Sequence, residues 1–99
     1  MMADIDVYDF NNSVAEFICA GLRKYIEENK KSAFPTCADA ILYDAARLWD
    51  NEDKLVEWHR IIEALADKFE ALSKEYHPSQ ESINEAFDEL KRIYKGLWI

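Results

Sequence analysis

Glycine, proline and cysteine are all scarce in this 99-residue chain, which has two of each. A glycine-rich phosphate-binding loop needs several glycines in close succession, so two isolated glycines exclude that kind of nucleotide site. Pro35 and Pro78 each separate two strongly periodic segments, where a residue without a backbone N–H ends a helix. With so few turn-forming residues, the sequence indicates helices joined by short loops.

The two cysteines, Cys19 and Cys37, could pair in principle. Cys19 lies within an apolar helical run, and disulfides are rare in the cytoplasm, so we expect two free, structural thiols. Neither cysteine has an expected histidine and acid to orient it, and no serine lies in a nucleophile elbow. The sequence therefore predicts no catalytic residue, no cofactor and a protein that is not an enzyme.

Long apolar runs and an excess of positive charge are missing as well. No stretch approaches the roughly 20 residues that span a bilayer, and the first residues lack the features of a signal peptide. We therefore expect a cytoplasmic protein without membrane contact. The 20 acidic residues outnumber the 12 basic ones and give a net charge of -8, which disfavours direct binding to nucleic acid. A protein partner with a basic surface fits this charge better.

Apolar residues at helical spacing are abundant. The first helix is expected from Asn12 or Ser13 to Asn29, because Ser13 and Glu16 form a capping box and the apolar residues after them recur every three or four positions. Three further helices are expected over residues 36–50, about 55–76 and 79–97. Residues 1–11 are expected to form an irregular lead-in to one domain spanning 1–99. The predicted fold class is all-α, a four-helix bundle or a similar small helical array.

The same periodicity assigns individual residues to the core. Phe69 continues the longest apolar stripe and is placed at the centre of the core, whereas Phe87 and Tyr94 belong to the stripe of the last helix. Gly21, inside the first helix, is expected to permit a close helix crossing.

Two pairs of carboxylates, Asp67 with Glu70 and Glu85 with Asp88, have the spacing of magnesium-binding motifs in all-helical nucleotide pyrophosphohydrolases. A helix turns about 100 degrees per residue, which puts each pair roughly 120 to 180 degrees from the apolar stripe of its helix. A magnesium site needs carboxylates that converge inward from facing helices. The pairs are therefore expected to point to solvent, and no metal site is predicted.

The two histidines suggest no zinc site. His59 lies beside the apolar stripe and one turn before Glu63, so an ordinary surface ion pair is expected there. His77 lies in the turn before Pro78, and no third ligand has a zinc-like spacing to either histidine.

Several short features stand out along most of the chain: Asp6-Val-Tyr-Asp-Phe-Asn11 followed by Ala15-Glu-Phe-Ile18 and Leu22, Glu57-Trp58 and Ile61-Ile62 followed by Phe69-Glu70, and the ending Gly96-Leu97-Trp98. With them the chain resembles a group of small all-helical proteins of similar length that are encoded by tailed bacteriophages. The segment 32–51 differs from that group, which commonly has a more glycine-rich stretch there. The resemblance implies a phage origin and a role inside an infected bacterium. It implies no activity and no catalytic residues.

These features favour a phage-encoded accessory protein that binds a host or phage protein and thereby inhibits a host defence or redirects a host enzyme. Its expected contact residues are three exposed carboxylates, which could imitate nucleic acid by charge, and an aromatic residue near the end of the chain: Glu63, Asp67, Glu70 and Trp98. One alternative is a helical oligomer that binds a small ligand or nucleotide between subunits, with or without hydrolase activity. A pocket with converging basic residues such as Arg23, Arg47 or Arg92 would favour this oligomer. A further alternative is a homodimeric structural protein of the phage.

Overall fold

The computed structural model describes residues 10–31, 49–75 and 77–97. These residues form three α-helices and one short 3-10 helix, and none of them is in a β-strand. The helices are α1 (Phe10–Asn29), α2 (Asn51–Lys74) and α3 (Gln80–Ile93), and the 3-10 helix η4 (Tyr94–Gly96) continues from α3. The all-α prediction is confirmed. None of the described helices is long and apolar enough to cross a membrane.

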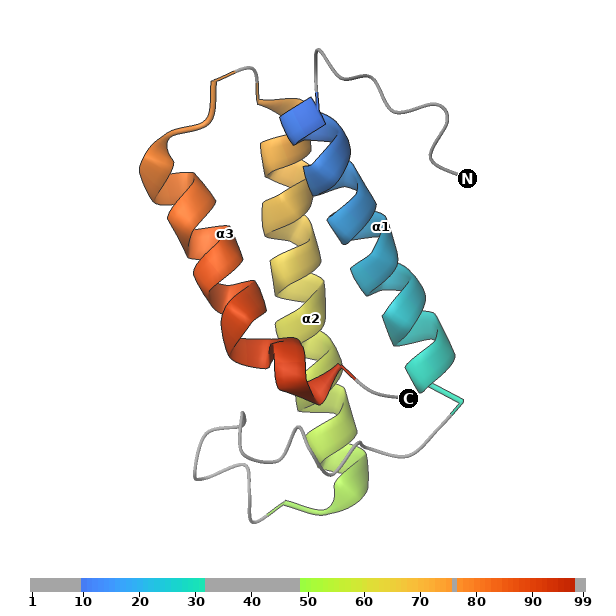
Figure 1. Cartoon of the computed structure of the whole chain (residues 1–99). Coiled ribbons are helices and arrows are strands. Elements are labelled where there is room, and N and C mark those ends of the chain that lie inside the picture. The colour runs from blue at the N-terminus through green and yellow to red at the C-terminus, as the bar shows by residue number, and fades with distance from the viewer. Residues whose placement is uncertain (1–9, 32–48, 76, 98–99) are drawn as a thin grey trace.

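The described helices are three in number, so they do not by themselves make the expected four-helix bundle. A helix was also expected over residues 36–50. All of this segment except residues 49 and 50 lies outside the described part of the chain. Figure 1 shows α2 between α1 and α3, with both neighbours running antiparallel to it.

Side chains cap the beginnings of α2 and α3. The side chain of Asp50, the residue before α2, accepts a hydrogen bond from the backbone N–H of Asp53 at 2.8 Å. Ser79 has the same role before α3, where its hydroxyl oxygen accepts from the N–H of Ser82 at 3.1 Å. These side chains pair backbone donors that have no partner within the helix, which fixes where each helix begins.

The predicted start of the first helix was wrong. Helix α1 already includes Phe10, so Ser13 and Glu16 lie inside the helix and do not cap its end. The spacing of a capping box also occurs within a helical turn, where its residues carry no boundary information. The third predicted helix also ends earlier than expected, because α2 stops at Lys74, two residues before the last position of its apolar stripe.

The core lies along the face of α2 that contacts both neighbouring helices. Phe69 is completely buried, as predicted. It is joined by buried apolar residues from all three helices: Ala15, Cys19, Leu22, Ile26, Trp58, Ile61, Ile62, Leu65, Ala66, Leu72, Ala86 and Ile93. Helix α1 packs along much of α2, whereas α3 contributes only Ala86 and Ile93 to the fully buried set. Helix α2 is therefore the central element of the fold.

Two residues of the last apolar stripe are more exposed than predicted. Phe87 contacts Phe69 with the two rings nearly perpendicular and their centroids 5.1 Å apart, yet 41% of Phe87 remains exposed. Tyr94 is 71% exposed. The stripe of α3 is wider than the line along which this helix meets α2, so residues at its edge stay in solvent.

Gly21 does not mediate a close helix crossing among the described residues. It is exposed, and a methyl group added at its Cα would meet no atom of another helix within 4 Å.

Candidate functional site

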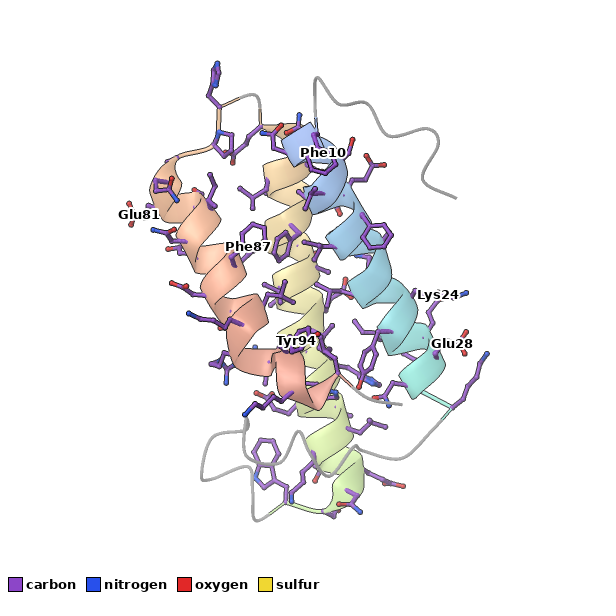
Figure 2. All side chains as sticks on the ribbon, viewed as in Figure 1. Phe10, Lys24, Glu28, Glu81, Phe87 and Tyr94 are labelled. Carbon is purple, nitrogen blue, oxygen red and sulfur yellow. The ribbon has the colours of Figure 1, made fainter. Side chains whose placement is uncertain are left out.

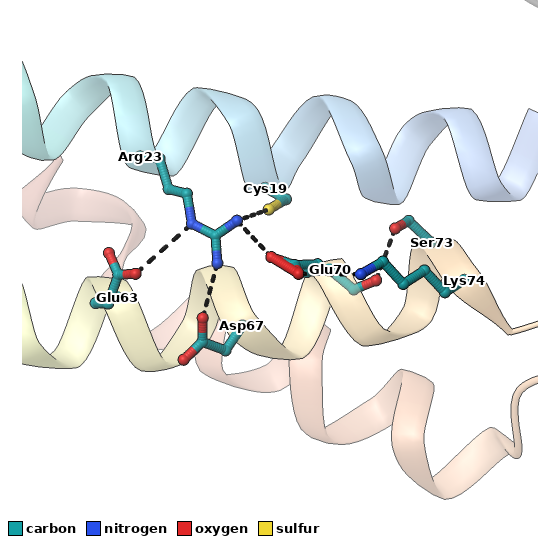
Figure 3. Close-up of polar contacts among 7 residues, drawn as sticks. All are labelled: Cys19, Arg23, Glu63, Asp67, Glu70, Ser73 and Lys74. Carbon is teal, nitrogen blue, oxygen red and sulfur yellow. Dashed lines mark hydrogen bonds and ion pairs between the residues drawn. The ribbon is translucent and has the colours of Figure 1, made fainter.

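Three carboxylates form one row on α2, which we call the acidic row: Glu63, Asp67 and Glu70. Residues three and four positions apart lie on the same side of a helix, so the row runs along α2 over about two turns. The row lies at the edge of the face that packs on α1 (Figure 3). It is not part of the core.

Arg23 reaches the acidic row from α1. Its Nη1 atom donates to Oε1 of Glu70 at 2.5 Å and its Nη2 atom donates to Oδ1 of Asp67 at 2.7 Å. The Nε atom lies 3.6 Å from Oε1 of Glu63. One planar guanidinium group therefore contacts all three carboxylates, because its donors diverge in a fixed fork.

Neighbouring side chains complete the cluster. Nη1 of Arg23 also lies 3.2 Å from Sγ of Cys19, one helical turn earlier on α1. Lys74 donates to the second carboxylate oxygen of Glu70 at 3.2 Å, and the Ser73 hydroxyl donates to the backbone carbonyl of Glu70 at 2.7 Å. Glu70 is thus the most heavily bonded member of the acidic row.

The net charge of the cluster is negative. Arg23 and Lys74 supply two positive charges against the three negative charges of the acidic row. Hydrogen bonds from Arg23 and then Lys74 lower the pKa of Glu70 below its ordinary value, and the bond to Glu70 raises the pKa of Arg23. The side chains of Glu63 and Asp67 are 53% and 65% exposed, so the outer part of the row is available from solvent.

The thiol of Cys19 is buried and free. Burial is the main cause that raises its pKa, and the three carboxylates of the acidic row add to this, against the opposing effect of Arg23. At neutral pH this environment keeps the thiol protonated, which is the less nucleophilic form. Cys37 lies outside the described residues.

The structure agrees only in part with the predicted solvent-facing carboxylates. Glu63 and Asp67 are largely exposed, but all three residues of the acidic row also contact Arg23, which sequence reasoning considered only as a pocket cation. The spacing of the acids was visible in the sequence, whereas the position of Arg23 of α1 opposite them was not. Trp98, the fourth predicted contact residue, lies outside the described residues. Partner binding by these residues stays a prediction.

Helices α2 and α3 carry the two carboxylate pairs considered as metal ligands. Asp67 and Glu70 contact Arg23, and Glu85 and Asp88 are exposed on α3. Over residues 10–31, 49–75 and 77–97, no group of three or more histidine, cysteine, aspartate or glutamate side chains is arranged to hold a metal ion.

His59 makes a different contact from the one expected. Its Nε2 atom lies 2.8 Å from Oδ1 of Asn29, a completely buried residue at the end of α1. Glu63, the expected partner, contacts Arg23 instead. Burial, followed by the positive charge of Lys30, lowers the pKa of His59. The neutral ring therefore acts as a link between α1 and α2.

The basic residues named for a ligand pocket do not converge in the described part of the chain. Arg23 lies beside the acidic row, while Arg92 contacts Glu89 one turn earlier on α3. The two arginines line different surface hollows. Arg47 lies outside the described residues.

No family model, curated protein or solved structure matches this chain. The geometry of the described residues is therefore the basis for a functional proposal.

Proposed function

We propose that this is a phage-encoded accessory protein that acts by binding a host or phage protein through the acidic row of α2. The observation that supports the proposal best is the fixed position of the row. Arg23 contacts Glu63, Asp67 and Glu70 across the α1–α2 interface, and more than half of Glu63 and Asp67 remains exposed.

The shared arginine reduces the entropic penalty of binding. A free glutamate or aspartate side chain must be ordered when a partner binds it, and this ordering opposes association. In the acidic row each carboxylate already has one oxygen near the guanidinium group of Arg23. The outward-facing oxygens of Glu63 and Asp67 can then accept hydrogen bonds from a partner with little further loss of freedom.

The charge of the chain defines the chemistry of this partner. A protein of net charge -8 attracts a basic surface over a distance and repels polyanions. A basic groove that normally holds nucleic acid would be a suitable target, since the row presents negative charge in its place. Occupation of such a groove would inhibit a host defence protein or redirect a host enzyme in the cytoplasm of the infected bacterium.

Capture from infected cells tests this function. The tagged chain and its Glu63→Gln, Asp67→Asn double variant would be used to capture proteins from lysates of the infected bacterium, followed by quantitative mass spectrometry. We expect a basic protein that is enriched by the native chain and at least about tenfold less by the variant, the size of loss that removing close interfacial charges produces.

A matched control separates local contact from overall charge. The Glu85→Gln, Asp88→Asn variant removes the same two charges from exposed positions on α3 and should capture the partner as the native chain does. Equal loss with both double variants, or no loss with either, would contradict a role of the acidic row.

The proposal includes a fourth helix over residues 36–50, which would extend the three described helices to a four-helix bundle. Its apolar positions recur at helical spacing, with Thr36 and Asp39 as a capping box. Slow amide hydrogen exchange over this segment in the native chain would support the fourth helix, and exchange at the unprotected rate would contradict it.

A further inference from the structure

Two lysines at the carboxyl end of α3 and in η4 have no acidic partner among the described residues. Most described basic side chains have an acidic partner: Arg23, Lys24, Lys31, Arg60, Lys74 and Arg92. Within the described residues, Lys30, Lys68, Lys91 and Lys95 make no ion pair, and of these four only Lys91 and Lys95 lie one helical turn apart. In a chain with 20 acidic residues against 12 basic ones, two adjacent lysines without acidic partners form an unusual local surface.

Two aromatic rings lie beside these lysines. Phe87 precedes Lys91 by four positions, and Tyr94 and Lys95 follow Lys91 by three and four positions. The four residues therefore share one side of the α3–η4 segment. Phe87 is 41% exposed and Tyr94 is 71% exposed. Both rings are labelled on this segment in Figure 2. We call the four residues the basic aromatic face.

A shallow hollow of about 790 Å³ runs along this face and is lined by Phe87, Asp88, Leu90, Lys91, Arg92, Tyr94 and Lys95. Three of these side chains are cationic and one is anionic, so the hollow is positive in a molecule whose net charge is -8. Its remaining lining is apolar or aromatic. Such a surface is complementary to a segment that alternates carboxylates with apolar side chains.

We propose that the basic aromatic face binds an acidic amphipathic segment of a partner protein. Lys91 and Lys95 contact carboxylates of that segment, and the rings of Phe87 and Tyr94 contact its apolar side chains. Aromatic residues that are partly exposed and flanked by charge are the usual anchors of protein interfaces, because their contact area comes with little loss of side-chain freedom.

The local charges favour a short acidic segment over a nucleic acid or a membrane. Lys91, Arg92 and Lys95 cover less than two helical turns. Four acids of α3 precede them in the sequence: Glu81, Glu85, Asp88 and Glu89. An extended polyanion would meet these acids and the negative field of the whole chain. A short peptide segment can contact the cations alone.

This inference goes beyond the proposed function, because it assigns a second surface of opposite charge to a different helix. The proposed function and this inference can fail separately. Loss of binding at the acidic row of α2 leaves the basic aromatic face intact, and the converse also holds.

A peptide titration tests the inference on the full chain. The probe is a synthetic helical peptide with Leu at positions i, i+3, i+4 and i+7 and Glu elsewhere, and its binding is followed by fluorescence anisotropy. We expect saturable binding that weakens with salt. The Lys91→Glu, Lys95→Glu variant should weaken it at least about tenfold, and Tyr94→Ala at least about fivefold, the usual effects of losing interfacial charges and an aromatic anchor.

Two controls make the test local. The Lys24→Glu, Lys31→Glu variant changes the net charge by the same amount at exposed positions in α1 and just after it. It should change binding less than about twofold, because neither lysine lines the hollow of the proposed contact. The Glu63→Gln, Asp67→Asn variant should bind the peptide as the native chain does. The amide chemical-shift changes that the peptide causes in the native chain should map to residues 87–97.

Several outcomes would overturn the inference. They are an absence of saturable binding, equal weakening by both lysine variants, and shift changes confined to α1. A peptide with the same composition in scrambled order should bind at least about fivefold more weakly, since it cannot align its apolar side chains with both rings. Tighter binding of anionic lipid vesicles or single-stranded DNA, lost in the Lys91→Glu, Lys95→Glu variant, would replace the protein partner by that polyanion.

Discussion

The indole N–H of Trp58 donates a hydrogen bond to the hydroxyl oxygen of Tyr25 at 3.1 Å, and this joins the amino-terminal part of α2 to α1. The Tyr25 hydroxyl in turn donates to the carbonyl oxygen of Gly96 in η4 at 3.4 Å. Trp58 is completely buried, so its N–H cannot exchange this partner for water. A single hydroxyl group therefore connects three elements from distant parts of the sequence.

Removal of this hydroxyl should destabilise the fold. We expect Tyr25→Phe to lower the free energy of unfolding by about 1 to 3 kcal/mol, the usual penalty for a buried donor left without a partner. Urea titration monitored by tryptophan fluorescence measures the loss. Tyr94→Phe is the matched control, because Tyr94 is 71% exposed, and it should change stability by less than about 0.5 kcal/mol.

Phe69 and Asp67 test which side of α2 faces the core. Phe69→Ala should lower the free energy of unfolding by about 3 to 5 kcal/mol, because the phenyl group is completely buried. Asp67→Asn should lower it by at most about 1 kcal/mol, since an exposed ion pair contributes little. Denaturant titration compares the two variants. A larger effect at Asp67 than at Phe69 would mean that the face of α2 is assigned incorrectly.

The contact between Arg23 and Glu70 should make stability depend on pH in the acidic range. The pKa of Glu70 is lowered from its ordinary value of 4.5, so its carboxylate binds protons less readily in the folded chain than in the unfolded one. The resulting stabilisation is complete above the ordinary pKa and is lost as the pH falls through the folded pKa.

Arg23→Gln should remove most of this dependence. The free energy of unfolding would be measured for the native chain and the variant over a series of pH values at and below neutrality. We expect the native chain to be more stable near pH 7 and the difference to shrink as Glu70 is protonated. Lys68→Gln, at an exposed position of α2, should keep the native pH profile. A difference that grows toward low pH would contradict the assignment.

His59 should produce a pH dependence nearer to neutrality. Its pKa is lowered from 6.5 by burial and by Lys30, so the unfolded chain binds a proton at a higher pH than the folded chain does. Stability is therefore retained above the ordinary pKa and falls as the pH drops below it, until the folded form is protonated too.

The test at this position is His59→Gln, whose amide can still donate to Asn29. The slope of unfolding free energy against pH just below 6.5 should be flatter in the variant than in the native chain. An NMR titration of the His59 ring gives the folded pKa directly. A midpoint above 6.5 would show that an acidic group outweighs burial at this site.

Helix α2 could be predicted from sequence because its apolar residues keep an unbroken three- and four-residue spacing. The start of α1 could not, since the pattern of Ser13 and Glu16 fits both a cap and a helical turn. The exposure of Tyr94 was missed for a different reason. Periodicity gives the direction of a side chain but not how far the neighbouring helix extends to cover it.

The contacts between helices at the candidate site could not be predicted from the sequence either. The spacing of Glu63, Asp67 and Glu70 was enough to place them on one outer row of α2. Their contact with Arg23 depends on which face of α1 meets α2, and 40 or more residues separate the partners in sequence. The link from His59 to Asn29 has the same origin.

The narrow contact of α3 with the rest of the core has a consequence for motion on slow timescales. Only Ala86 and Ile93 of α3 are fully buried, whereas α1 buries side chains along most of its length against α2. We expect α3 and η4 to detach from the other two helices in a partial opening that needs less free energy than global unfolding. Native-state hydrogen exchange under mild denaturant should then show amides of α3 exchanging before those at the centre of α2. A partner bound to α3 would close this opening and slow the exchange of the helix as a unit.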